Sequence, residues 1–181
     1  TDSKMKQLYL SIIIPAYNEE KNIRLGALDK VARYLDTKDY RWEVIIVDDG
    51  STDGTKALIE EFTHRNPHSR ILKNPHQGKA ATVMAGIFAA LGDIVLFTDL
   101  DQATPIGESE KLLPWIEKGY DVVIGSRQGK REGAPLLRRF MARGFMSLRT
   151  VLLGLKGISD TQCGFKAFRR TVAHAIFKNL S

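Results

Sequence analysis

The sequence predicts an α/β protein with a mostly parallel central sheet flanked by helices. Short apolar runs rich in β-branched residues alternate with helix-length segments along the chain, a pattern typical of strands joined by right-handed crossovers. Polar and glycine-containing motifs follow four of these runs. Because parallel sheets bind ligands beyond the carboxyl ends of their strands, the same pattern predicts a ligand site at that edge.

Five apolar runs are predicted strands, at residues 8–15, 42–51, 70–74, 93–99 and 120–127. We expect helices over 20–35, 54–65, 78–91, 106–118 and 136–155. Gly26 weakens the first helix because glycine is a poor helix former, and Thr52 or Asp53 is the expected cap of the second. The 181 residues contain no repeat, low-complexity tract or linker, so we expect a single domain over residues 1–181.

The composition limits the classes of partner and site. Lysine and arginine number 27 against 21 aspartates and glutamates, a net charge of +6, which favours nucleotides, lipid phosphates or nucleic acid as partners. The one cysteine, Cys163, excludes an internal disulfide and a multi-cysteine metal site and is typical of a reducing compartment. No apolar run approaches the roughly 18 residues of a membrane span, and no signal peptide precedes the first strand.

Two carboxylates, Asp99 and Asp101, flank Leu100 where the fourth predicted strand ends. A solvated turn explains an isolated Asp-x-Asp pair. Acid clusters at neighbouring strand ends instead favour a hard divalent cation, which takes one or two carboxylates together with substrate phosphates. Because alternate residues of a strand face opposite ways, the chain must turn here for both acids to reach one ion.

Further polar residues follow the first and second strands. Asp48 and Asp49 can cap the helix after Gly54, but two acids exceed what one cap needs, and a carboxylate also accepts hydrogen bonds from a base or a ribose. Tyr17 is either an aromatic residue at the rim of the site or a platform for a base, and Glu19 can accept hydrogen bonds beside it.

Gly78 and Lys79 open the helix predicted over 78–91, and a helix N-terminus next to a lysine is an anion site. The Walker spacing and the G-x-G-x-x-G fingerprint are both absent, which disfavours P-loop and dinucleotide-binding enzymes. The histidines have no metal-ligand spacing and are interpreted as surface residues: His64, His68, His76 and His174.

The segment 127–155 is basic and amphipathic. Apolar or small residues recur at helical spacing, and Arg139, Arg143 and Ser147, four residues apart, share one polar stripe. Such a stripe is often only a solvated face, but Glu132 is the one acid of the segment up to residue 149. A basic amphipathic helix suits a membrane surface or a phosphate-bearing partner, and arginine suits bidentate phosphate binding.

Taken in order, these motifs resemble those of a known family. The motifs are IIIPAYNEE, VIIVDDGSTDGT, FTDLD, VVIGSR and GISDTQCGFKAFRR, between about residues 10 and 170. They are similar to the family 2 glycosyltransferases of the GT-A fold, and within them to the polyprenyl-phosphate hexosyltransferases. The run DTQCGFKAF resembles the dolichyl-phosphate glucosyltransferase branch in particular.

The resemblance implies an inverting enzyme that moves a hexose, with glucose favoured, from a nucleotide sugar, with UDP-glucose favoured, to a polyprenyl or dolichyl phosphate. It implies Mg²⁺ or Mn²⁺ on Asp99 and Asp101, with the nucleotide sugar bound by Pro15, Tyr17, Glu19, Asp48 and Asp49. Lys79 joins this set through its place at the expected anion site. The acceptor phosphate would be bound by Arg127, Arg143 and Ser147, and Arg139 is added because it shares their polar stripe. With the two metal-binding acids, Arg127 and Asp160 are the candidate catalytic residues; Asp160 either orients the acceptor or the sugar, or caps a helix near Lys166.

Ala103 stands where the mannose-synthase pattern D-x-D-x-Q has glutamine, and Gln102 is one place early. This departure favours the glucosyltransferase branch. Family members usually continue beyond the Gly-Phe-Lys segment, so we expect further C-terminal sequence and an enzyme at the cytoplasmic face of a membrane, peripheral or anchored, without a nucleic acid partner. The alternatives are a GDP-mannose donor, a sugar-hydroxyl acceptor with Asp160 as base, and a non-catalytic nucleotide-binding module.

Overall fold

The structure is a computed structural model that describes residues 9–126 and 163–179. The chain forms two compact units, Thr1–Val123 with Gly164–Ser181, and Ile124–Cys163. Nearly all of the described residues belong to the first unit, which also holds the site described below. The helix predicted over 136–155 lies outside the described residues.

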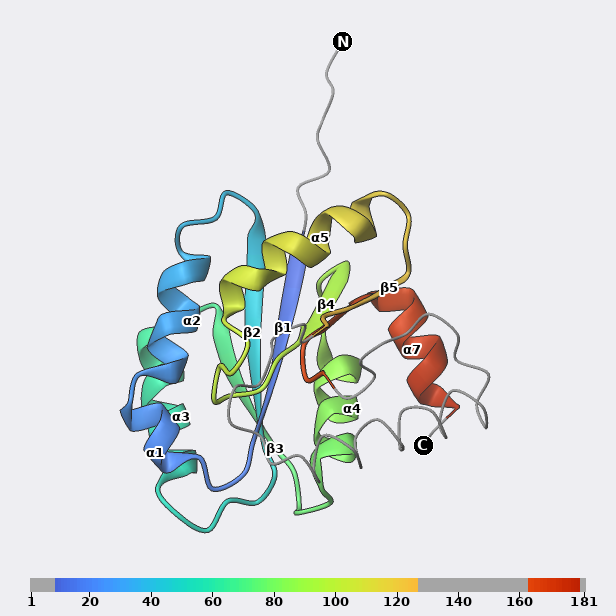
Figure 1. The fold of residues 1–181 in the computed structure, drawn as a ribbon. Helices are drawn as coiled ribbons and strands as arrows, with labels where there is room; N and C mark the ends of the chain where they lie inside the picture. The colour runs from blue at the N-terminus through green and yellow to red at the C-terminus, as the bar shows by residue number, and fades with distance from the viewer. Residues whose placement is uncertain (1–8, 127–162, 180–181) are drawn as a thin grey trace, which may run out of the picture. The chain divides into compact units, whose positions relative to one another are not determined.

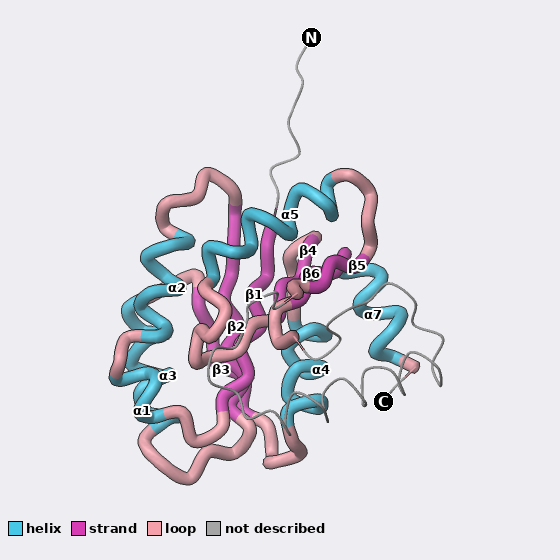
Figure 2. Tube along the Cα trace, viewed as in Figure 1, coloured by secondary structure: helices cyan, strands magenta, loops and turns pink. Residues whose placement is uncertain are grey.

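Within the described ranges, six strands form one sheet in the order β3-β2-β1-β4-β6-β5 (Figure 2). Parallel pairing joins β1 to β2 and β4, and β2 to β3, whereas β4 and β6 are antiparallel. The predicted mostly parallel sheet is therefore confirmed. The strands are β1 (Tyr9–Ala16), β2 (Arg41–Asp48), β3 (Ser69–Lys73), β4 (Ile94–Phe97), β5 (Val122–Ile124) and β6 (Lys166–Arg169).

Helices cover both faces of this sheet. Figure 1 shows α1, α2 and α3 on one side and α4 and α7 on the other. The side change follows from the strand order, because the crossover from β3 to β4 runs back past β2 and β1. The helices are α1 (Glu20–Arg24), α2 (Ala27–Leu35), α3 (Thr55–Arg65), α4 (Lys79–Ala89), α5 (Ser109–Glu117), preceded by the 3₁₀ turn η1 (Ile106–Glu108), and α7 (Arg170–Lys178).

Helix α4 packs directly on β1 and β2, and a glycine makes this approach possible. A Cβ on Gly86 would lie 2.3 Å from Cγ2 of Ile13 and 3.1 Å from Cγ2 of Val47, so no larger residue fits without moving the helix. The apolar core on this face contains Ile13, Ile45, Val47, Val83, Ile87, Ala90, Val95, Phe97, Phe168 and Ala173. The packing fixes the N-terminal end of α4 beside the carboxyl ends of the strands.

Two predicted elements differ from the structure. The helix expected over 20–35 is two helices, because Gly26 adopts a left-handed conformation with φ of +78° between α1 and α2. The helix expected near Lys166 is wrong, since 166–169 form strand β6 and α7 begins at Arg170. Within the described residues, no helix has the length and apolar character needed to cross a membrane.

Candidate active site

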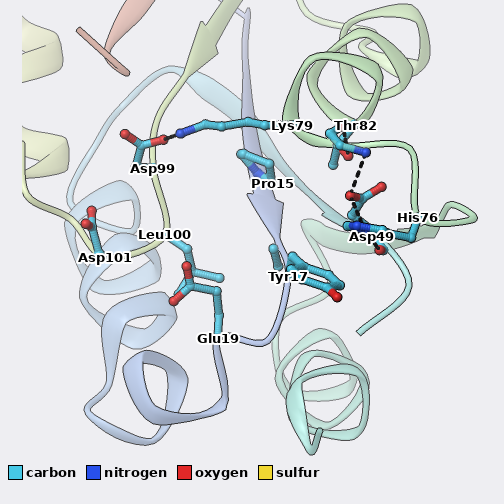
Figure 3. Close-up of a pocket in the computed structure, with 12 residues that line it drawn as sticks. Pro15, Tyr17, Glu19, Asp49, His76, Lys79, Thr82, Asp99, Leu100 and Asp101 are labelled. Carbon is cyan, nitrogen blue, oxygen red and sulfur yellow. Dashed lines mark hydrogen bonds and ion pairs between the residues drawn. The ribbon is translucent and has the colours of Figure 1, made fainter. Parts of the chain in front are cut away.

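A cavity of about 280 Å³ opens beyond the carboxyl ends of β1 and β4. These two strands are neighbours in the sheet, yet the chain reaches β4 only after forming β2 and β3 on the other side of β1. The cavity thus lies at the topological switch point, where open α/β sheets bind their ligands. It is lined by Pro15, Ala16, Tyr17, Glu19, Asp49, His76, Gly78, Lys79, Thr82, Asp99, Leu100 and Asp101 (Figure 3).

Asp99 and Asp101 both line this cavity because the chain turns after β4. Leu100, which is 2% exposed, anchors the turn. Gln102 has φ of +51°, and its backbone N–H and side-chain amide both donate to the Asp99 carbonyl oxygen, at 3.3 and 2.9 Å. Oδ1 of Asp101 accepts the Ala103 N–H at 3.0 Å. The expected turn is therefore confirmed.

The two carboxylates provide the hard oxygen donors that Mg²⁺ and Mn²⁺ prefer, so the residues present fit a divalent cation. The amide of Gln102 bonds to the backbone and supplies no further ligand. Across residues 9–126 and 163–179, no group of three or more His, Cys, Asp and Glu side chains is placed to hold a metal ion. A cation bound here would take its remaining ligands from substrate and water.

Lys79 is the first residue of α4 and extends across the cavity to the acidic end (Figure 3). Its Nζ lies 2.5 Å from Oδ1 of Asp99. The preceding residue, Gly78, has φ of +87°, a conformation that L side chains rarely adopt. The start of α4 therefore places the N–H groups of a first helical turn, which have no partner within the helix, next to an ammonium group, the arrangement expected of an anion site.

Asp49 is 3% exposed and lies at the opposite end of the cavity. Its Oδ1 accepts the Gln77 N–H and its Oδ2 the Gly78 N–H, each at 3.0 Å, and Nδ1 of His76 lies 2.9 Å from Oδ2. Burial acts to raise the pKa of Asp49, but these hydrogen bonds, with that of the Thr82 hydroxyl, outweigh it and lower the pKa. Asp49 is an ionised group that fixes the β3–α4 loop.

Neither acid of the Asp48-Asp49 pair caps α3. Oδ1 of Asp53 accepts the N–H of Thr55, the first residue of that helix, at 3.0 Å, as the sequence interpretation allowed. Asp48 is buried, and its Oδ1 accepts the Ser51 N–H at 3.3 Å. The structure therefore brings Asp49 to the cavity and leaves Asp48 outside its lining.

Tyr17 and His76 form an aromatic wall beside Asp49. Their ring centroids are 4.3 Å apart and the rings are inclined by 23°. Nδ1 of His76 also lies 3.1 Å from the Asp49 carbonyl oxygen. From the sequence, His76 is predicted only as a surface residue and not as a site residue. The available signal was its position two residues before Gly78, in the loop that leads to the anion site.

The remaining predicted residues divide into two groups. Pro15 and Glu19 line the cavity, and Glu19 is tied to α3 by its N–H, which donates to Oγ1 of Thr55 at 2.7 Å. The candidate acceptor and catalytic residues outside the described ranges are Arg127, Arg139, Arg143, Ser147 and Asp160. The structure thus gathers seven of the predicted residues around one cavity: Pro15, Tyr17, Glu19, Asp49, Lys79, Asp99 and Asp101.

Comparison with known proteins shows the family of the chain. The sequence pattern of the family described as "Glycosyl transferase family 2" matches residues 11–177. The chain belongs to glycosyltransferase family 2. This family 2 chain is 38% identical to a dolichyl-phosphate beta-glucosyltransferase of Trichomonas vaginalis, over 96% of its own length and 55% of that protein. It is 35% identical to the Saccharomyces cerevisiae dolichyl-phosphate beta-glucosyltransferase and 34% identical to the human one.

These alignments cover 97% of the chain and 59% of the yeast protein, and 99% of the chain and 60% of the human protein. The family 2 chain thus spans somewhat more than half the length of these relatives. It is similar in structure to a Pyrobaculum calidifontis mannosyltransferase in complex with GDP-Man and Mn²⁺. The TM-score is 0.67, the identity is 22%, and the alignment covers 95% of this chain and 47% of that one.

A second structural relative is glucosyl-3-phosphoglycerate synthase from Mycobacterium tuberculosis in complex with UDP. The TM-score is 0.64, the identity is 22%, and the alignment covers 91% of this chain and 58% of that one. At this level of identity the likeness concerns the fold alone. The expected GT-A fold of the family 2 chain is confirmed.

Proposed function

We propose that this chain is the catalytic domain of an inverting hexosyltransferase that moves glucose from UDP-glucose to dolichyl phosphate or another polyprenyl phosphate. The observation that carries the proposal is one cavity at the switch point of the sheet with an aromatic wall at one end and two carboxylates at the other. The names of the relatives at 34–38% identity supply the donor sugar and the acceptor class.

The nucleotide lies along the cavity in this proposal. Its base occupies the end formed by Tyr17, His76 and Asp49, where a ring can stack and a base N–H can meet a carboxylate. Its diphosphate lies at the start of α4, where Lys79 and the backbone N–H groups offset negative charge.

Asp99 and Asp101 are the residues that would hold Mg²⁺ or Mn²⁺ beside the diphosphate. A divalent cation bound there supplies charge stabilisation to a nucleoside diphosphate leaving group. The protein's own contribution is to hold both carboxylates toward one cavity by the turn after β4 and to orient the donor before the reaction.

The acceptor phosphate is already ionised near neutral pH, so the reaction needs no strong general base. One of its oxygens forms a bond to the anomeric carbon while the bond from that carbon to the UDP oxygen breaks. Arg127, Arg139, Arg143 and Ser147 would orient this phosphate, with Asp160 orienting the acceptor or the sugar. A lipid-linked acceptor places the reaction at a membrane surface, and we propose its cytoplasmic face.

The test is a panel of donors followed by a transfer assay. Melting of the protein is measured with Mn²⁺ and UDP-glucose, UDP-N-acetylglucosamine or GDP-mannose, and glucose transfer to a short polyprenyl phosphate is measured in detergent. We expect UDP-glucose to stabilise the protein most and the lipid phosphate to become labelled. Stabilisation by GDP-mannose alone would reverse the donor assignment. Transfer to a free sugar but not to the lipid phosphate would favour the sugar-hydroxyl acceptor.

A further inference from the structure

The carboxylate of Asp99 lies directly against the backbone of Gly164. A Cβ placed on Gly164 would be 2.0 Å from Oδ2, 2.6 Å from Cγ and 2.9 Å from Oδ1 of Asp99. Real Cβ atoms do not approach other atoms so closely, so one side or the other would have to move. Gly164 has no positive φ; the requirement for glycine here is one of space and not of backbone conformation.

The antiparallel pairing of β4 with β6 explains why these two residues meet. Phe97 is paired with Lys166, and Ile94 with Arg169. Asp99 lies two residues beyond Phe97, and Gly164 lies two residues before Lys166, so the same register places them opposite each other. Phe165, which is 1% exposed, anchors the segment between Gly164 and β6. The contact therefore continues the β4–β6 register just beyond the paired ends of both strands.

Lys79 also contacts this carboxylate, with its Nζ 2.5 Å from Oδ1. Asp99 is therefore bounded by an ammonium group at Oδ1 and by a backbone without a side chain, which comes closest to Oδ2. The position of its oxygens in the cavity, and hence their position relative to Asp101, depends on the space above Gly164.

We propose that Gly164 is a positioning residue for metal-dependent donor binding. The absence of a side chain at Gly164 leaves the space that the Asp99 carboxylate occupies. This space sets the orientation in which Asp99, together with Asp101, binds a divalent cation. This inference rests on the proposed function, because it requires Asp99 to be a metal ligand. Gly164 itself touches neither the donor nor the cation and acts through Asp99.

The test measures the gain in UDP affinity that Mn²⁺ provides, as the ratio of the dissociation constants measured calorimetrically with EDTA and with Mn²⁺. We expect Gly164→Ala to reduce this gain by about 10- to 100-fold, as for other residues that orient a metal ligand, and to leave the affinity in EDTA unchanged. Gly107→Ala is the matched control, because a Cβ there meets only the Tyr34 ring at an ordinary 3.6 Å.

A double-mutant cycle separates positioning from a general structural role. In the Asp99→Ala background, Gly164→Ala should cause no further loss of Mn²⁺-dependent affinity, because the side chain through which it acts is gone. If Gly164→Ala lowers the melting temperature, the double variant should recover it, since the opposing carboxylate has been removed. Failure to recover, or an equal loss of UDP affinity with and without Mn²⁺, would make Gly164 a structural residue and overturn the inference.

The outcomes also separate this inference from the proposed function. If the UDP affinity of the wild-type protein does not depend on Mn²⁺, the proposed metal site is excluded, and this inference is excluded with it. If Mn²⁺ increases the UDP affinity of the wild-type protein and Gly164→Ala does not reduce this increase, only the positioning role of Gly164 is overturned. The proposed function then stands.

Discussion

The ammonium group of Lys79 lies 2.5 Å from Oδ1 of Asp99, so the acidic end of the cavity contains a cation that belongs to the protein. Lys79 belongs to α4 and Asp99 follows β4, and the pair spans the cavity between them (Figure 3). A divalent cation that binds Asp99 must share or replace this partner. Because Lys79 is the first residue of α4, its ammonium group is also a candidate partner for a diphosphate bound at the start of that helix.

Replacing Lys79 by methionine should therefore have opposite effects on the two ligands. The pair is partly exposed, with 61% of the lysine side chain and 34% of the aspartate side chain accessible, so its loss should raise Mn²⁺ affinity in the absence of nucleotide by no more than about fivefold. UDP affinity in EDTA should fall, because the anion site loses its charge.

Mn²⁺ binding followed by electron paramagnetic resonance and UDP binding followed by calorimetry check the two effects of Lys79→Met. Lys73→Met is the control, since Lys73 pairs with Glu60 outside the cavity lining. A drop in both affinities would show that Lys79 only holds the site together.

Asp101→Ala should abolish the Mn²⁺-dependent part of UDP binding and leave the fold intact. Asp101 is exposed, and its visible contact is the hydrogen bond from the Ala103 N–H, whose loss costs only about 0.5–1.5 kcal/mol of unfolding free energy. Calorimetry with UDP and Mn²⁺ provides the measurement. Asp36→Ala is the control, because Asp36 is exposed and lies at the C-terminal end of α2. UDP affinity that is unchanged and still metal-dependent would remove Asp101 from the site.

The placement of the acids and of the anion site could be predicted because it depends on local pattern. An apolar run that stops at a polar motif marks the carboxyl end of a buried strand, and parallel strands bring such ends to one edge. Tyr17, Asp49 and Asp99 come from three different strand ends, yet all line one cavity. The helix start at Lys79 was visible from the preceding glycine.

The missed features depend on contacts between distant parts of the chain. His76 becomes a site residue because Asp49 binds the loop that carries it. Strand β6 has four residues, and its pairing with β4 rather than its own sequence makes it a strand. The opposition of Gly164 and Asp99 follows from that pairing. No periodicity in the sequence encodes a register between segments more than 60 residues apart.

The lowered pKa of Asp49 makes stability depend on pH. A carboxyl whose pKa is lower in the folded than in the unfolded protein stabilises the fold above its unfolded pKa, and this contribution is lost as the pH falls through the folded value. The unfolded value is about 3.9, so the contribution is complete above about pH 5 and declines below it.

Asp49→Asn should accordingly lower the melting temperature at pH 7 more than at pH 3, because the amide has one acceptor oxygen for the donors that Asp49 satisfies with two. Thermal melting at the two pH values is the measurement. The exposed Asp36→Asn is the control and should show no such difference. Equal destabilisation by Asp49→Asn at both pH values would mean that the charge of Asp49 does not contribute to stability.

Arg143→Lys tests the acceptor site proposed from the sequence. The spacing of Arg139, Arg143 and Ser147 predicts one polar stripe, and lysine cannot reproduce the bidentate contact of a guanidinium with phosphate. Loss of one charge-assisted hydrogen bond of about 1.5–3 kcal/mol should reduce transfer to a polyprenyl phosphate by roughly 10- to 100-fold. UDP-glucose affinity should not change.

The transfer assay on Arg143→Lys uses a short polyprenyl phosphate in detergent, with calorimetry on UDP-glucose as the second readout. Arg127→Lys should behave in the same way, and Arg65→Lys on the surface of α3 is the control. Wild-type transfer by both Arg143→Lys and Arg127→Lys would show that these arginines do not hold the acceptor phosphate and would favour the sugar-hydroxyl acceptor.

The aromatic wall of Tyr17 and His76 forms the base end of the cavity in the proposed function. If Tyr17 and His76 face the base, His76→Ala should weaken UDP binding by about 1–3 kcal/mol, the range found when an aromatic partner of a stacked base is removed. Binding of pyrophosphate, which has no base, should be unaffected in the presence of Mn²⁺, because the loss is confined to one end of the cavity.

His76→Phe keeps the stacking with Tyr17 and loses the contact with Asp49, so the two variants separate the effect of the aromatic wall from that of the hydrogen bond. His68→Ala, which removes a ring packed edge-on against Trp42, is the matched control. Equal weakening of UDP and pyrophosphate would place the effect of His76 on the loop that begins α4, and tighter UDP binding by His76→Ala would mean that the imidazole occupies the place of the base.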